Sequence, residues 1–189
     1  ASISPDSKGE NLCAQKIAML LKKDGLPVEF VPTGDGRHSV VCFLEGSHPQ
    51  NSGKTLILMG HYDTVGIDEF TMLDATGKIA FSPRLLHELL QKYLLSKESL
   101  SDQENSALRD LQKMWRQPGT VLYEPSWMFG RGSLDMKSGI AALLSVMKEF
   151  HRDQTFFSGN VLFLACPDEE NESLGVLSSL PYLLHLKKS

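Results

Sequence analysis

A short apolar run that ends in two polar side chains constrains the fold of this chain most. Residues 55–59 (Thr-Leu-Ile-Leu-Met) are almost continuously apolar, which predicts a strand covered on both faces of an α/β sheet. Gly60 then allows the backbone to approach a neighbour closely. His61 and Asp63 follow two residues apart, and on an extended backbone such side chains point to the same side. Because open α/β sheets bind ligands at the carboxyl ends of their strands, we expect both side chains at a ligand site.

The histidine and its neighbouring carboxylate allow two interpretations. A carboxylate often holds the imidazole of a metal ligand in orientation, so His61 could bind a metal with Asp63 behind it. Equally, a histidine at a strand end can form a purely structural hydrogen bond with a local aspartate. The pair alone does not decide between them, and two later segments favour the metal.

The first of these segments is the glycine-rich stretch 130–139, Gly-Arg-Gly-Ser-Leu-Asp-Met-Lys-Ser-Gly. Nucleotide binding is the first alternative, but Asp135 stands where the dinucleotide motif needs glycine. Lys137 also lacks the preceding glycine of a phosphate-binding loop, and an acid in the loop would repel phosphate. The segment instead presents Asp135 between a tight turn and the start of a helix, which aims a carboxylate at a fixed point.

The second segment is Asp168-Glu169-Glu170, directly after a predicted buried strand at 160–166. A solvated acidic loop is the common alternative. However, three carboxylates at the carboxyl edge of a sheet repel one another unless a cation is present. Adjacent side chains diverge, so one glutamate can bind a metal while the other faces a water molecule. Histidine and carboxylates without cysteine suit zinc or a similar divalent ion.

Composition excludes several classes of protein. The 189 residues suit one domain with a sizeable core. The net charge of −4 gives no basic excess for nucleic acid or an anionic membrane. No apolar run reaches transmembrane length, and the N-terminus lacks the pattern of a signal peptide. The three cysteines are widely spaced without a C-x-x-C motif, which predicts reduced cysteines in a cytoplasmic protein.

The remaining elements follow from periodicity and caps. The first helix is expected to begin at a capping box, Ser7 to Glu10, with apolar residues at helical spacing after it. Further helices are expected to begin at Ser82-Pro83, at residues 101–104 and after Gly139. Strands are expected at 28–31 and 39–44, and a leucine-rich helix at the end of the chain. The region 68–126 is expected to be an inserted helical hairpin on the surface.

Three motifs together resemble the co-catalytic zinc peptidases of the aminoacylase and glutamate-carboxypeptidase type. The motifs are Gly60-His61-x-Asp63-Thr64-Val65, Gly130-Arg131-Gly132-x-x-Asp135-Met136-Lys137-x-Gly139 and Asp168-Glu169-Glu170. They occur in the family's order and span most of the chain. The long helical insert between the first two looks like the bacterial arginine-utilisation branch of this family. The resemblance implies an α/β fold, a three-layer sandwich with a mainly parallel sheet flanked by helices.

The resemblance also implies a role for each site residue. His61, Asp135 and Glu170 would be metal ligands, with Asp135 bridging two divalent ions and followed by a cis peptide bond. Zinc is the expected metal, with cobalt or manganese as alternatives. Glu169 would be the general base of catalysis, and Asp63 would orient His61. The implied reaction is hydrolysis of an amide bond in a peptide or an N-acyl amino acid, in amino-acid catabolism with arginine as the implied case. The resemblance is also compatible with a homodimer of a longer form.

The chain departs from the family pattern in ways that predict an incomplete site. The family has a further acidic ligand some distance after the glutamate pair and a histidine near its far C-terminus. Glu172 lies too close to Glu170 for the first role, and His185 in the leucine-rich tail is expected to be structural. The family's lid and dimerisation domain also has no counterpart here. We therefore expect residues 1–189 to be the N-terminal part of a catalytic domain and to be inactive alone. The alternative is a non-catalytic binding or scaffold protein that keeps the fold.

Overall fold

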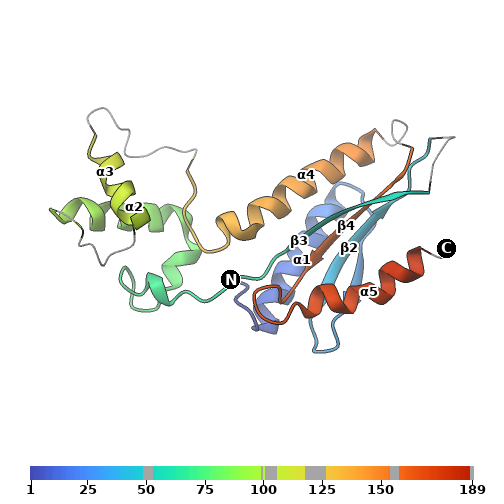
Figure 1. Ribbon diagram of the computed structural model, residues 1–189, viewed down its shortest axis with the longest axis horizontal. Coiled ribbons are helices and arrows are strands. Elements are labelled where there is room, and N and C mark those ends of the chain that lie inside the picture. Colours follow the sequence, from blue (N-terminus) through green and yellow to red (C-terminus); the bar gives the residue numbers. More distant parts are fainter. Residues whose placement is uncertain (49–52, 99, 101–105, 118–126, 154–157, 188–189) are drawn as a thin grey trace. The chain divides into compact units, whose positions relative to one another are not determined.

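The computed structural model describes residues 1–48, 53–98, 100, 106–117, 127–153 and 158–187 (Figure 1). The chain divides into two compact units. One consists of residues 1–66 and 134–189, and the other of residues 67–133. Each unit is described by itself.

The first unit is built on a four-stranded sheet. In spatial order its strands are β1 (Glu29–Pro32), β2 (His38–Leu44), β4 (Asn160–Cys166) and β3 (Thr55–His61). Strands β3 and β4 are parallel, with His61 opposite Cys166 at their carboxyl ends. The pairings of β1 with β2 and of β2 with β4 are antiparallel. The α/β class is therefore confirmed, but the described sheet is mixed rather than mainly parallel.

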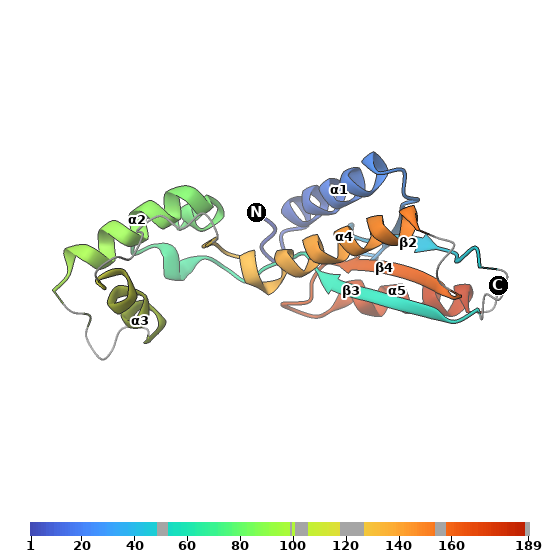
Figure 2. The same ribbon diagram turned by 90° about the horizontal axis from the view of Figure 1, so that it is seen from above.

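Helices cover both faces of this sheet, as the three-layer prediction requires (Figure 2). Helices α1 (Ser7–Lys23) and α4 (Gly139–Arg152) pack on one face, and α5 (Leu174–Leu186) packs on the other. Along β4, Phe163 faces the core shared with α1 and α4, whereas Leu162 faces the core shared with α5. This alternation makes β4 buried on both faces, as its apolar sequence predicts.

The prediction that residues 55–59 are covered on both faces is wrong for the described structure. Strand β3 pairs with β4 on one side and forms an edge of the described sheet. Leu56 and Met59 are consequently 54% and 51% exposed. Only the end of the strand is buried, where Gly60 and His61 approach the start of α4. An apolar run predicts a strand that can be buried, but strand order decides whether neighbours cover it.

The N-cap of helix α1 lies one residue before the predicted cap, Ser7. Its N-cap is Asp6, whose carboxylate accepts a hydrogen bond from the backbone N–H of Lys8. Glu10 does not close a capping box with Ser7, because its side chain is fully buried and bonds to Arg37 instead. The three cysteines are free, as predicted.

The second unit is helical. Its elements are η1 (Asp68–Phe70), η2 (Lys78–Phe81), α2 (Pro83–Ser96) and α3 (Ser106–Trp115). Helix α2 begins at Pro83 as predicted, whereas the expected helix start at residues 101–104 lies outside the described residues. The two longer helices share a core that includes Leu90, Leu94 and Trp115. Within the described ranges of both units, no helix is long and apolar enough to cross a membrane.

Candidate metal centre

The candidate site lies at the carboxyl ends of the parallel strands β3 and β4. His61 is the last residue of β3, and the Asp168–Glu170 segment begins two residues after β4. Gly60, which precedes the histidine, lies close to the segment that leads into α4. A Cβ at this position would lie 2.8 Å from the terminal methyl group of Met136, just before α4. The glycine thus lets the segment that carries Asp135 approach the end of β3.

Asp135 lies beside the imidazole of His61. Its Oδ1 is 3.0 Å from His61 Nε2. The peptide bond between Asp135 and Met136 is cis, as the resemblance implies. The Asp135 side chain is largely exposed, whereas His61 is buried. The carboxylate therefore faces both the imidazole and the solvent, which leaves it free to bind a further group.

Asp63 lies on the other side of the imidazole. Its carboxylate is fully buried, and its Oδ1 is 3.3 Å from His61 Nδ1. Neither of these two atoms has a hydrogen bond of acceptable geometry among the described residues. Asp63 Oδ2 accepts a hydrogen bond of 3.0 Å from the backbone N–H of Glu170. One carboxylate therefore contacts both the imidazole and the loop that follows β4.

The donor set of this site fits a metal ion. His61, Asp135 and Glu170 each offer one ligand atom, and these atoms all lie within 4.8 Å of one another. Two ligand atoms of a tetrahedral zinc ion, each about 2.0–2.2 Å from the metal, lie about 3.3–3.6 Å apart. The observed spacing of 3.0 Å between imidazole and carboxylate is close to this value. Two acids and a buried imidazole thus lie close enough together for divalent cations to bind between them.

Both glutamates after β4 bring a carboxylate near the imidazole of His61. Glu169 Oε2 is 3.7 Å from His61 Nε2, and its side chain is about half exposed. Burial, and then the negative charge of Asp135, raise the pKa of Glu170. A carboxylate whose pKa rises for these reasons gains from a nearby cation, since the cation offsets both effects.

The sequence did not predict two features of this region, the burial of Lys137 and the burial of Asp168. The Lys137 ammonium is buried without a hydrogen-bond partner among the described residues. Burial lowers its pKa, although Cys13, Asp63 and Glu170 attract its positive charge. Asp168 is fully buried and bonded to Arg37, so it does not line the site with the glutamates. The motif identified a lysine and an acid at these positions, but it carried no signal of their burial.

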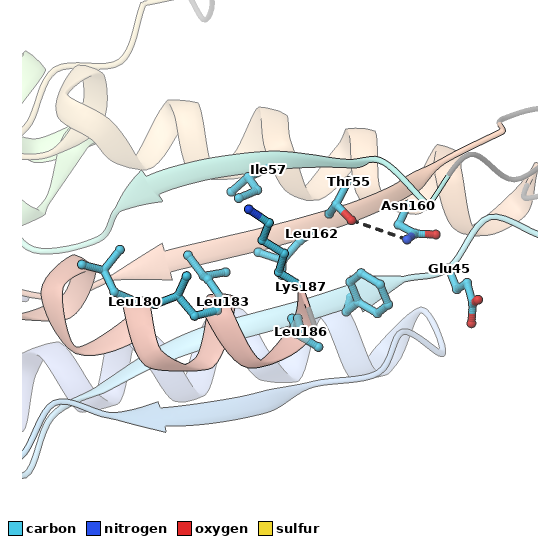
Figure 3. Close-up of a pocket in the computed structure, with 12 residues that line it drawn as sticks. Glu45, Thr55, Ile57, Asn160, Leu162, Leu180, Leu183, Leu186 and Lys187 are labelled. Atoms are coloured by element: carbon cyan, nitrogen blue, oxygen red, sulfur yellow. Dashed lines mark hydrogen bonds between the residues drawn. The ribbon is translucent and has the colours of Figure 1, made fainter. Parts of the chain in front are cut away.

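A separate cavity of about 730 Å³ lies away from this chemistry (Figure 3). Leu180 and Leu183 of α5, with Lys187 just after this helix, face Ile57 and Leu162 of the sheet across it. Its lining contains neither the histidine nor the acids of the candidate centre. This cavity is therefore separate from the candidate metal centre.

The fold and the site together define a class: an α/β protein with a candidate metal centre at the carboxyl ends of adjacent parallel strands. Residues 109–188 match the family model described as Peptidase family M20/M25/M40. This match confirms the resemblance found in the motifs, over a part of the chain that includes Asp135 and the two glutamates.

Three similar proteins illustrate this relationship. Protein RocB of Bacillus subtilis is 36% identical over 152 residues, which cover 80% of this chain and 23% of RocB. A succinyl-diaminopimelate desuccinylase of Leptothrix cholodnii is 24% identical, over 92% of this chain and 34% of the enzyme. The solved structure of Bacillus subtilis YXEP, described as a dinuclear metal binding peptidase from the M20 family, has a TM-score of 0.50 at 12% identity. That likeness covers 97% of this chain and 35% of YXEP, and it shows the fold. The chain thus spans only a minor part of each.

Proposed function

We propose that this chain is part of a metal-dependent hydrolase that cleaves an amide bond in a peptide or an N-acyl amino acid. The observation that carries the proposal is the convergence of His61, Asp135 and Glu170 at the carboxyl ends of two parallel strands. The names of similar proteins, a desuccinylase and a dinuclear metal binding peptidase, are compatible with this chemistry. Arginine catabolism and zinc remain predictions from the resemblance.

In this proposal His61, Asp135 and Glu170 would hold the two divalent ions, and both ions would use Asp135 as a ligand. Divalent ions held by such a site polarise a carbonyl group and lower the pKa of water. The negative charge of the Asp63 carboxylate, 3.3 Å from His61 Nδ1, favours the tautomer with its ring proton on Nδ1, which leaves Nε2 available as a ligand. The partly exposed carboxylate of Glu169 accepts a proton from the attacking water and returns it to the leaving amine.

The ligand count also supports a prediction about the 189 residues alone. In this assignment His61 and Asp135 would hold one ion, and Asp135 and Glu170 would hold the other. Catalytic zinc usually has three protein ligands and a water molecule. Each ion is thus one protein ligand short, which favours weak metal binding and no hydrolysis by this part of the chain. The same count favours the alternative function, a binding or scaffold protein without a complete site.

A metal titration combined with an activity assay distinguishes the two functions. We expect a longer form to bind about two zinc, cobalt or manganese ions per chain and to hydrolyse some N-acyl amino acids or dipeptides. The 189-residue chain should hydrolyse none of them at ordinary enzyme rates, about 1–10³ s⁻¹. A longer form that binds no metal would contradict the proposed function. Rapid turnover by the 189 residues would show that their site is complete.

A further inference from the structure

A buried network of charged side chains lies behind the loop that carries the two glutamates. Arg37 Nη1 is 2.6 Å from Asp168 Oδ1 and 3.1 and 3.0 Å from the two carboxylate oxygens of Glu10. Its Nε donates to Asp35 Oδ2 at 2.7 Å. Arg37 is 3% exposed, and Glu10 and Asp168 are fully buried. One guanidinium thus joins α1, the turn before β2 and the loop after β4.

The network holds the backbone of this loop as well as its side chains. Glu10 Oε1 accepts a 3.0 Å hydrogen bond from the backbone N–H of Asp168. The Asp168 carboxylate accepts one from the backbone N–H of Leu174 at 3.2 Å and one from the Ser4 hydroxyl at 3.1 Å. The backbone carbonyl of Asp168 accepts a further bond from the N–H of Ser173 at 2.6 Å. Asp168 is therefore fixed through its N–H, its carbonyl and its side chain.

This fixation matters because the backbone of Asp168 has an unusual conformation. Its φ is +66°, in the left-handed region that non-glycine residues enter only at an energetic cost. Such conformations persist where the surroundings over-determine them. The next two residues are Glu169 and Glu170, and the N–H of Glu170 is bonded to Asp63. The segment is thus held on both sides of Glu169.

We infer that Arg37 and Glu10 are positioning residues, which hold Asp168 in this conformation and thereby aim Glu169 and Glu170 at the metal centre. The inference rests on the proposed function, since it concerns the same site. Buried ion pairs contribute little net stability compared with apolar packing. The directional bonds of the guanidinium and of the Glu10 carboxylate, however, fix where the loop backbone can lie. The effect of the network should therefore appear in loop order and metal affinity.

The test uses a longer form of the chain, which is expected to bind metal, and two readouts. Hydrogen exchange measures the protection of the Asp168 and Glu170 amides without any metal, and calorimetric titration measures Zn²⁺ affinity. We expect Arg37→Met to speed the exchange of both amides at least tenfold and to weaken Zn²⁺ binding about tenfold or more. Arg37→Lys should fall between Arg37→Met and the wild type, because it keeps the charge but loses the planar fork. Adding Asp168→Asn to Arg37→Met should change amide exchange and Zn²⁺ affinity by less than Asp168→Asn does alone, because both substitutions remove the same contact.

Two control variants separate positioning from general loss of stability. Leu21→Ala removes a fully buried side chain of α1 outside the network and should lower the melting temperature. Lys148→Met removes an exposed ion pair with Asp24. Neither should change the protection of the Glu170 amide or the Zn²⁺ affinity of the folded chain. If Arg37→Met does not fold, the same comparison is made with Arg37→Lys and Glu10→Gln.

The outcomes separate the inference from the proposed function. Unchanged amide protection and Zn²⁺ affinity in the folded Arg37 and Glu10 variants would overturn the positioning role and leave the metal centre intact. Loss of amide protection in those variants would support control of the loop by Arg37 and Glu10. If a longer wild-type form then bound no Zn²⁺, the metal centre would be overturned while control of the loop would stand. Equal effects of Leu21→Ala on both readouts would also overturn the inference, because the network would then act only through stability.

Discussion

Asp63→Asn should weaken metal binding although it changes the shape of the side chain very little. The carboxylate of Asp63 contacts two groups, His61 Nδ1 at 3.3 Å and the backbone N–H of Glu170 at 3.0 Å. If the asparagine oxygen accepts from Glu170, its NH₂ group faces Nδ1. The imidazole then has to accept at Nδ1 and carry its proton on Nε2, the nitrogen that faces Asp135. A protonated Nε2 cannot be a metal ligand.

Two estimates of the size of this effect agree. Metal binding would leave the amide NH₂ opposite a ring N–H, and an unsatisfied buried donor costs about 1–3 kcal/mol. Loss of the partner that orients a ligating histidine typically weakens metal binding about 10–100-fold. That range corresponds to about 1.4–2.7 kcal/mol. Because the amide matches the carboxylate in volume, the fold should survive, so the loss should appear in metal affinity.

The assay is calorimetric titration of a longer form of the chain with Zn²⁺ or Co²⁺, with thermal unfolding followed by circular dichroism. Asp153→Asn is the matched control, because it removes the same charge from a half-exposed side chain of the same unit. Asp135→Ala should lose more affinity than Asp63→Ala, since Asp135 is a proposed ligand of both ions. Wild-type affinity in Asp63→Asn, or equal losses in the two alanine variants, would refute the assigned roles.

Three further predictions follow from the same geometry. Glu169→Gln in a longer, active form should keep its metal but lose about 10²–10⁴-fold of its hydrolytic rate, and retained activity would exclude Glu169 as the general base. Gly175→Ala should lower the free energy of unfolding, measured with urea, by about 1–3 kcal/mol, because the added Cβ would lie 2.5 Å from the carbonyl oxygen of Pro167. Gly66→Ala is the control, since open space surrounds that position. Equal stability of the two variants would contradict the clash. Burial raises the pKa of Glu10 from 4.5 to about 7, despite its hydrogen bond to a guanidinium. The folded chain then holds a proton that the unfolded chain releases, so the free energy of unfolding should fall as the pH rises from about 4.5 to 7. Glu10→Gln should flatten this dependence, and an unchanged slope would show that another group causes it.

Local sequence predicted the elements whose signals lie within a few residues. The i and i+2 spacing of His61 and Asp63 placed both side chains at one end of a strand, where the structure brings them within 3.3 Å. Pro83 predicted the start of α2, and the apolar run 160–166 predicted the central buried strand. Such patterns succeed because backbone period, proline geometry and continuous burial are local properties.

Tertiary structure decided the features that depend on distant partners. Residues 55–59 and 160–166 are similar apolar runs, but strand order makes one an edge of the described sheet and the other its centre. Glu10 matched a local capping pattern, yet it bonds to Arg37 and to the backbone of Asp168, which is 158 residues away. The Asp-Glu-Glu segment predicted three acids at one edge of the sheet. In the fold, Asp168 is buried against the Arg37 guanidinium, whereas the two glutamates lie near the candidate centre. The sequence could not show this difference, because the partners of Asp168 come from segments that meet only after folding.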